Sequence, residues 1–225
     1  MRDFSAVELG ASLYVPATHK DILAIANGEK FPHLKSVIFC LEDAINCDDL
    51  EVSMKNITNM LNNFEQNELK LFIRPRDIEN LTQLLKAPNI KKIDGFALAK
   101  FSTCNMHEYL SVLETTCSAF HLMPVLESLD MFDINALKNI REFLLKKRIH
   151  NILTIRVGAE DMFKMIGIKK DCNTSIHDLH VSSGVLADIL ATFKPYGFNV
   201  SSTVYNCLKN LEFFTQEVRR DVKEG

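Results

Sequence analysis

The stretch TIRVGAEDMFKMIG, residues 154–167, decides which folds are open to this chain. An apolar run ends at Val157-Gly158, two acids follow at Glu160 and Asp161, and an apolar helical stretch then resumes. The acids belong either to a solvated loop or to a metal or substrate site at the rim of a parallel barrel. The choice depends on whether other predicted strands end in the same way.

Short apolar runs alternate with longer stretches of helical period along the whole chain. They are continuous and lack apolar/polar alternation, which is typical of parallel strands covered on both faces. Seven runs predict strands: ASLYV (11–15), SVIFCL (36–41), LKLFIR (69–74), IDGFALA (93–99), HLMPVL (121–126), NILTIRV (151–157) and FNVSST (198–203).

Repeated strand–helix units predict an α/β protein of the TIM (β/α)8-barrel type, with an open doubly wound sheet as the alternative. No GxGxxG opens the first predicted helix, which disfavours the dinucleotide-binding version of that alternative. No linker divides the chain, so residues 1–225 are predicted to form one domain. The runs supply seven strands, and the eighth strand of the barrel is apparently lacking.

Composition excludes several classes of partner. The chain has 225 residues and a net charge of −3, so no basic footprint for nucleic acid or an anionic membrane is evident. No apolar segment approaches the roughly 18–20 residues that span a bilayer. The six cysteines form no CxxC pair, which favours reduced, buried thiols in a cytoplasmic protein.

The predicted strands end in polar residues. In a parallel barrel, the carboxyl ends of all strands lie on the face that carries the chemistry. The residues at these ends are Glu42, Asp43, Arg74, Lys100, Glu127, Glu160, Asp161, Thr203 and Tyr205. The list mixes carboxylates with cations, which is the composition of a metal or anion site.

Glu127 and Asp161 follow neighbouring strands, which lie roughly 4.8 Å apart, so their carboxylates could converge on one point. Two close carboxylates repel unless a cation sits between them, and oxygen ligands suit Mg²⁺ or Mn²⁺ better than Zn²⁺. Arg74 could bind a substrate carboxylate with two parallel hydrogen bonds.

Each residue also has a structural alternative. Glu127 could charge the start of the following helix, Asp161 could cap its own helix, and Arg74 could form a salt bridge with Glu42 or Asp43.

The motifs resemble the HpcH/HpaI aldolase and citrate lyase beta-subunit family, in order and over nearly the whole chain. SLYVP (12–16) resembles the family's opening strand, and GAEDMFKMIG (158–167) resembles its GAEDLxxDLG segment closely. The other matching segments are CLEDAI (40–45), FIRPRD (72–77), GFALAKF (95–101) and PVLES (124–128). The nearest branch is that of the citrate-lyase-like C–C bond lyases found beside tellurium-resistance and stress genes.

The resemblance implies a TIM barrel that cleaves or forms C–C bonds beside a carbonyl, on small oxo-acids or acyl-thioesters. It implies Mg²⁺, with Mn²⁺ possible, held by Glu127 and Asp161. It assigns Arg74 to the substrate's oxo-acid end, with Glu42, Asp43 and Lys100 as further catalytic positions. Gly158 and Ala159 are expected to join Arg74 in substrate binding.

The chain departs from the family pattern at several positions. Ala11 stands where the family often has arginine, and Arg156 stands within the sixth strand where an apolar residue is common. If Arg156 points inward, it adds a cation to the site. These departures argue against citryl-thioester substrates.

The family also continues with an eighth strand, and an open barrel would leave two exposed strand edges, which favours a homo-oligomer. The rival functional hypothesis is a non-catalytic barrel that binds a metabolite or a partner in a stress-response complex.

Overall fold

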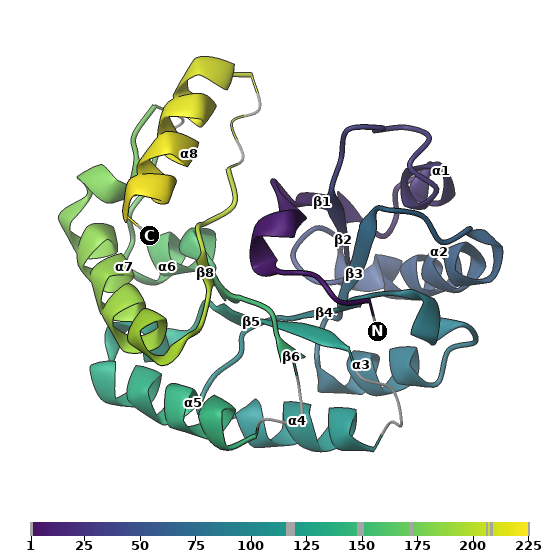
Figure 1. The fold of residues 1–225 in the computed structure, drawn as a ribbon, viewed down its shortest axis with the longest axis horizontal. Helices are drawn as coiled ribbons and strands as arrows, with labels where there is room; N and C mark the ends of the chain where they lie inside the picture. The colour runs from purple at the N-terminus through teal and green to yellow at the C-terminus, as the bar shows by residue number, and fades with distance from the viewer. Residues whose placement is uncertain are drawn as a thin grey trace. The chain divides into compact units, whose positions relative to one another are not determined.

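The computed structural model describes residues 2–115, 120–147, 151–171, 173–205, 207 and 209–224. Helices and strands alternate along the described chain (Figure 1). The strands are β1 (Leu13–Pro16), β2 (Ser36–Cys40), β3 (Lys70–Arg74), β4 (Gly95–Leu98), β5 (His121–Leu126), β6 (Asn151–Ile152), β7 (Ile155–Val157) and β8 (Val200–Ser201). The α-helices are α1 (Ile22–Ala26), α2 (Leu50–Asn63), α3 (Ile78–Leu85), α4 (Met106–Glu114), α5 (Ile134–Lys146), α6 (Ala159–Met165), α7 (His180–Phe193) and α8 (Leu211–Glu224).

The strands form a parallel sheet in the order β1-β2-β3-β4-β5-β7-β8, with β6 paired to β5. This order, with a helix after most strands, confirms the predicted α/β fold of the TIM-barrel type. The predicted sixth strand is interrupted, because Leu153 and Thr154 separate β6 from β7. The predicted seventh strand shortens to the two residues of β8, and no later strand occurs among the described residues.

The chain divides into two compact units. The first comprises Met1–Ala99, His107–Met123 and Ile149–Leu153, and the second comprises Lys100–Met106, Pro124–Arg148 and Thr154–Gly225. Strand β5 runs from one unit into the other. The single domain expected over 1–225 stays a prediction.

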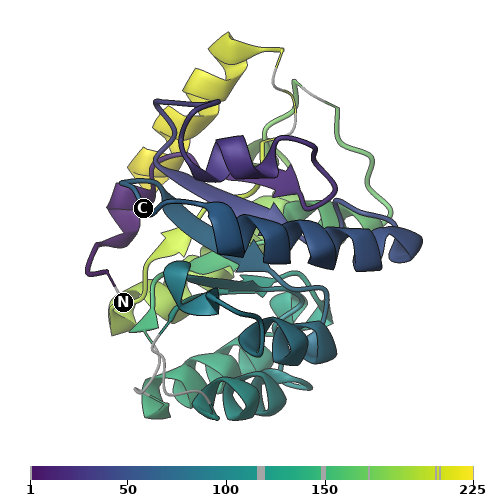
Figure 2. The ribbon, with the colours of Figure 1, turned by 90° about the vertical axis from the view of Figure 1, so that its right-hand side faces the viewer.

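In the first unit, β2 illustrates why these sequences form covered strands. All five of its residues are buried, and it pairs on both sides, with β1 and β3. Helices α1, α2 and α3 lie along one side of β1–β3, and the N-terminal segment lies on the other (Figures 1 and 2). Phe4 of that segment stacks edge-to-face on Phe72 of β3, with ring centroids 6.4 Å apart. The sheet is therefore covered on both faces, as its apolar runs require.

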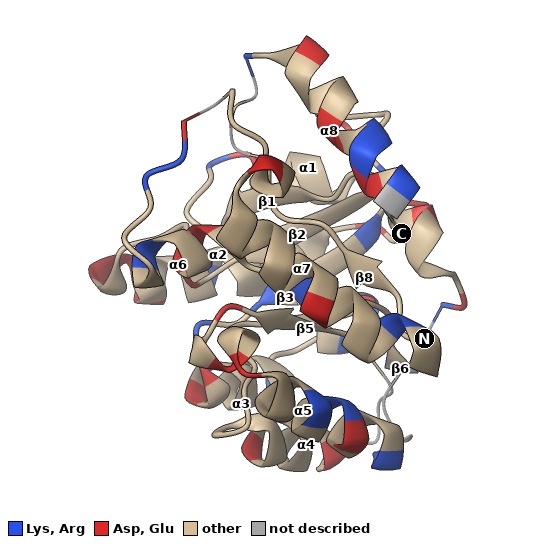
Figure 3. Cartoon of the chain, turned by 90° about the vertical axis from the view of Figure 1, so that its left-hand side faces the viewer, with Lys and Arg blue, Asp and Glu red and all other residues tan. Residues whose placement is uncertain are grey.

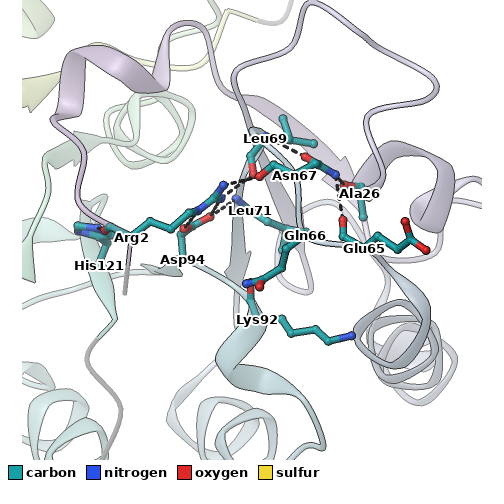
Figure 4. Close-up of polar contacts among 10 residues, drawn as sticks. All are labelled: Arg2, Ala26, Glu65, Gln66, Asn67, Leu69, Leu71, Lys92, Asp94 and His121. Atoms are coloured by element: carbon teal, nitrogen blue, oxygen red, sulfur yellow. Dashed lines mark hydrogen bonds and ion pairs between the residues drawn. The ribbon is translucent and has the colours of Figure 1, made fainter.

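A polar cluster holds the N-terminal segment to the first unit (Figure 4). Arg2 forms an ion pair with Asp94, which is 3% exposed, and Asp94 also accepts a hydrogen bond from the main-chain N–H of Leu71. The Arg2 guanidinium donates a hydrogen bond to the carbonyl of Leu69. The main-chain carbonyl of Arg2 contacts Nε2 of His121 at 2.8 Å. Hydrogen bonding to Asp94 raises the pKa of Arg2, so this cation persists at every working pH.

In the second unit, β5 pairs with β7, and β7 pairs with β8. Helix α8, which carries acidic and basic side chains along its length (Figure 3), is held by polar contacts to the segment before α7. His177 lies 2.9 Å from Asp221, and Arg220 lies 2.7 Å from Asp178. These contacts tie a predominantly polar helix to the unit.

The cysteines differ from the expectation of reduced, buried thiols. Cys40 is a buried free thiol, but Cys47 and Cys104 are exposed and free, and Cys207 is disulfide-bonded. Among the four cysteines that the structure describes, hydrophobic context predicted burial correctly only for Cys40, which lies inside a strand. Cys117 and Cys172 lie outside the described residues. Across the described part of the chain, no helix is long and apolar enough to cross a membrane.

Candidate metal and substrate site

Glu127 follows the last residue of β5 and is only 6% exposed. Its Oε1 accepts a hydrogen bond of 2.8 Å from the main-chain N–H of Lys100. Lys100 has a φ of 50°, in the left-handed region that residues other than glycine rarely adopt. This unusual backbone turn is accompanied by a fixed hydrogen bond that orients the buried carboxylate.

Gly158 lies directly against the same carboxylate. A Cβ built on Gly158 would stand 2.4 Å from Cβ of Glu127 and 2.5 Å from its Oε2. No real side chain tolerates such contacts, so a larger residue would displace Glu127. The φ of Gly158 is −94°, which other residues adopt readily, so close approach and not backbone conformation requires glycine here.

Asp161 lies in the first turn of α6, and the side chain is 15% exposed. The N-cap of this helix is Gly158, so the structural alternative of Asp161 as the capping residue is wrong. Its Oδ1 accepts a hydrogen bond of 2.8 Å from Nζ of Lys164, and its Oδ2 lies 3.9 Å from Nζ of Lys100. Oδ2 is buried and makes no hydrogen bond.

These two carboxylates fit a divalent cation. Glu127 and Asp161 present oxygens that lie within 4.8 Å of each other. A Mg²⁺ ion with bonds of about 2.1 Å spans nearly that separation between two ligand oxygens. The buried Asp161 Oδ2 without a hydrogen bond is the kind of atom that a bound ion satisfies.

Arg74, Glu42 and Asp43 come together in the first unit. Arg74 ends β3 and is 8% exposed at its side chain; its Nη2 lies 2.5 Å from Oε2 of Glu42 and 3.2 Å from Oδ2 of Asp43. Glu42 is buried, whereas Asp43 is 45% exposed. The salt bridges of the structural alternative are therefore present, and they hold the guanidinium in a fixed orientation.

A buried thiol lies beside this cluster. Cys40 is 1% exposed, and burial raises the pKa of its thiol, an effect that the nearby Arg74 cation partly opposes. A thiol whose pKa is raised stays protonated near neutrality and is a poor nucleophile. Cys40 therefore serves the packing of β2 and not the chemistry.

The predicted site residues thus fall into two groups, one in each unit: Glu42, Asp43 and Arg74 in the first, and Lys100, Glu127, Gly158, Ala159 and Asp161 in the second. Ala159 is buried at the start of α6. Sequence analysis missed Lys164, which stands three residues after Asp161 on the same helix. That i, i+3 spacing was the available signal.

The parallel sheet of strand–helix units defines the class as an α/β barrel-type protein. A buried carboxylate after β5 and a partly buried one after β7 add a candidate cation site. The chain belongs to the family of C–C bond lyases of the TIM-barrel fold, whose family model matches residues 3–225. Comparison with curated proteins finds no match.

Solved structures share the fold at low sequence identity. The citrate lyase beta subunit of M. tuberculosis, in complex with oxaloacetate and magnesium, superposes with a TM-score of 0.66 at 14% identity, covering 95% of this chain and 86% of that one. RipC of Yersinia pestis gives 0.65 at 18% identity, covering 94% and 83%. Malate synthase of Haloferax volcanii gives 0.72 at 12% identity, covering 95% and 68%.

Proposed function

We propose that this protein is a Mg²⁺-dependent carbon–carbon lyase or aldolase that acts on a small oxo-acid or its acyl-thioester. The observation that carries the proposal is the pairing of the buried Glu127 with the partly buried Asp161, whose oxygens lie within 4.8 Å while Asp161 Oδ2 has no hydrogen bond. Membership of the C–C bond lyase family supports the reaction class. The oxaloacetate, pyruvate and magnesium bound by structural neighbours support the substrate class and the ion.

In this proposal Glu127 and Asp161 hold the cation, with Mn²⁺ as a possible substitute. When bound, the cation would polarise the carbonyl group of the substrate. Arg74 binds the carboxylate of the oxo-acid through its guanidinium fork, and the ion pairs with Glu42 and Asp43 orient that fork. Lys100 fixes Glu127 through its main-chain N–H, and Gly158 and Ala159 form part of the substrate-binding surface.

The test is metal and substrate binding by calorimetry, followed by turnover of an oxo-acid with and without Mg²⁺. Glu127→Gln and Asp161→Asn each remove one anionic ligand and keep the side-chain size. We expect either change to weaken Mg²⁺ binding at least about 10- to 100-fold and to abolish turnover. Turnover that survives both substitutions, in variants with unchanged circular dichroism, would reject these roles.

A second candidate is a non-catalytic barrel that binds a metabolite or partner. Two observations favour it: Arg74 is already ion-paired with Glu42, and Lys164 is ion-paired with the Asp161 carboxylate. The same calorimetry discriminates, because Mg²⁺ binding without turnover of any oxo-acid would support this candidate and count against the lyase.

The proposal extends to the cell and the assembly. We place the protein in the stress-associated branch of the family, which rests on the motifs CLEDAI (40–45) and GAEDMFKMIG (158–167). We keep the cytoplasmic location as part of the proposal: the free thiols of Cys40, Cys47 and Cys104 support it, whereas the disulfide-bonded Cys207 counts against it. Self-association into a homo-oligomer completes the proposal.

A further inference from the structure

Helix α8 contributes little to the core of the second unit. Every residue from 211 to 223 is half-buried or exposed, whereas the helix before it, α7, buries Leu186, Ile189 and Phe193 among others. An isolated helix of about 14 residues is marginal in water, and most helices in proteins are stabilised by an apolar face packed on the rest of the fold. Contacts other than core packing therefore have to keep α8 in place.

Polar side chains hold α8 to the segment before α7, residues 173–178. Three side-chain pairs join the two: Ser175–Glu217, His177–Asp221 and Asp178–Arg220. The Asp178–Arg220 pair is largely open to water, and ion pairs in such a setting contribute little to stability. These contacts give α8 a defined position but only a weak hold on the unit.

A covalent bond provides a second anchor. Cys207 lies between β8 and α8 and is disulfide-bonded. Since Cys40, Cys47 and Cys104 are free, the bond joins Cys207 to a cysteine outside the described residues. With this bond, residues 208–210 are the only free link to α8; without it, the link is residues 202–210, roughly three times as long. The cost of closing a loop rises with its length, so breaking the bond disfavours docking of α8 about 5-fold.

The disulfide is accessible to a small thiol. Cys207 is half-buried, and disulfides that are partly exposed are the ones most readily reduced. Disulfides in cytoplasmic proteins, where they occur, are usually catalytic or redox-sensing. One thiol attacks the disulfide to form a mixed disulfide, and a second thiol then releases the protein sulfur. Two small thiols thus lose two electrons and become one disulfide, while Cys207 and its partner sulfur each gain a hydrogen.

We propose that the Cys207 disulfide is a redox-sensitive latch for α8. The oxidised form fixes the helix on residues 173–178, and reduction by a small thiol releases it. The helix and this segment both belong to the second unit. The segment follows α6, the helix that carries Asp161, so the latch restrains the part of the chain after that helix and takes no part in the chemistry.

Hydrogen exchange of the full chain, measured peptide by peptide with mass spectrometry, tests the latch. The protein is compared in glutathione disulfide and in excess glutathione. We expect peptides of α8 to exchange at least about 5-fold faster after reduction, and peptides of α7 to change less than about 2-fold. A peptide map without reductant should show Cys207 linked in the first sample and free in the second.

Two cysteine variants complete the experiment. Cys207→Ser should exchange in α8 like the reduced wild type and should not respond to glutathione. Cys47→Ser removes an exposed free thiol and is the matched control, which should respond as the wild type does. The comparison of the two wild-type samples needs no substitution, so it decides the question even if Cys207→Ser does not fold.

Three results would overturn the latch: equal exchange of α8 in both samples, a Cys207 thiol that stays free in glutathione disulfide, or faster exchange across the whole second unit. The last would show that the disulfide stabilises the unit and not α8 in particular. None of these readouts involves Mg²⁺ or an oxo-acid, so failure of the latch leaves the proposed function untouched.

Discussion

Several single residues in this chain have roles that depend on contacts with other elements. Lys100 adopts a left-handed backbone conformation, at a cost of order 1–3 kcal/mol, and its N–H meets the Glu127 carboxylate. Gly158 has no side chain, and a Cβ at this position would overlap the Glu127 side chain. The main-chain N–H of Lys100 and the missing side chain of Gly158 thus determine where one candidate metal ligand stands.

Gly158→Ala should disable the site while leaving both carboxylates in the sequence. The added Cβ would lie 2.4 Å from Cβ of Glu127, so the Glu127 carboxylate must leave its present position beside Asp161. We expect Mg²⁺ affinity to fall at least about 10-fold in calorimetry.

Gly184→Ala is the matched control for this substitution. Gly184 lies within α7, and a Cβ added there would meet nothing within 4 Å. This change should leave Mg²⁺ affinity unaltered and raise the free energy of unfolding by about 0.5–1 kcal/mol, because alanine favours a helix. A Gly158→Ala variant that binds Mg²⁺ as the Gly184→Ala variant does would contradict the close contact with Glu127.

At the scale of elements, the N-terminal segment acts as a cover for the sheet of the first unit. Phe4 packs on Phe72, and Arg2 forms its ion pair with the buried Asp94 (Figure 4). This segment has no strand or α-helix of its own before β1, so its place depends on these side-chain contacts.

Arg2→Met should destabilise the fold, because it leaves the Asp94 carboxylate buried without its cation. The free energy of unfolding in urea should fall by about 1–3 kcal/mol. Lys55→Met, which removes a cation from an exposed pair with Glu51 on α2, is the control and should change the stability by less than about 0.5 kcal/mol. Equal effects of the two substitutions would show that the Arg2 contact contributes no more than a surface pair.

At the scale of the whole molecule, self-association is the open question. Strands β1 and β8 stand at the two ends of the strand order. Helix α8 also exposes apolar side chains at spacings of seven and four residues, Leu211, Val218 and Val222, which share one helical face. In the proposed homo-oligomer, this apolar face of α8 packs against a second copy of the chain.

Light scattering after size-exclusion chromatography tests this assembly. We expect the wild type to elute at a multiple of the monomer mass, and Leu211→Glu combined with Val222→Glu to shift it to the monomer. Val52→Glu, on α2 at 53% exposure, introduces the same charge elsewhere and should leave the mass unchanged. A wild-type protein that remains monomeric at high concentration would refute self-association.

The fold was predictable in large part because burial leaves a pattern along the chain. Strand β2, apolar throughout and covered on both faces, could be recognised from its residues alone. The interruption between β6 and β7 could not be recognised, since Leu153 and Thr154 are buried like the residues of β7 that follow them. The hydrophobic pattern of the sequence indicates which residues are buried, but it does not indicate which main-chain groups pair between strands.

The same distinction applies to the candidate site. The sequence by itself determined which residues follow each strand. The carboxyl ends of parallel strands lie on the same side of a sheet, so the residues at these ends could be named as candidates. Glu127, Asp161 and Arg74 were found in this way. Only the tertiary structure decided that Gly158 lies against Glu127 and that Arg156 stands in register with Val125 of β5. Such contacts depend on distances between segments far apart in the chain or on side-chain directions, which local propensity does not encode.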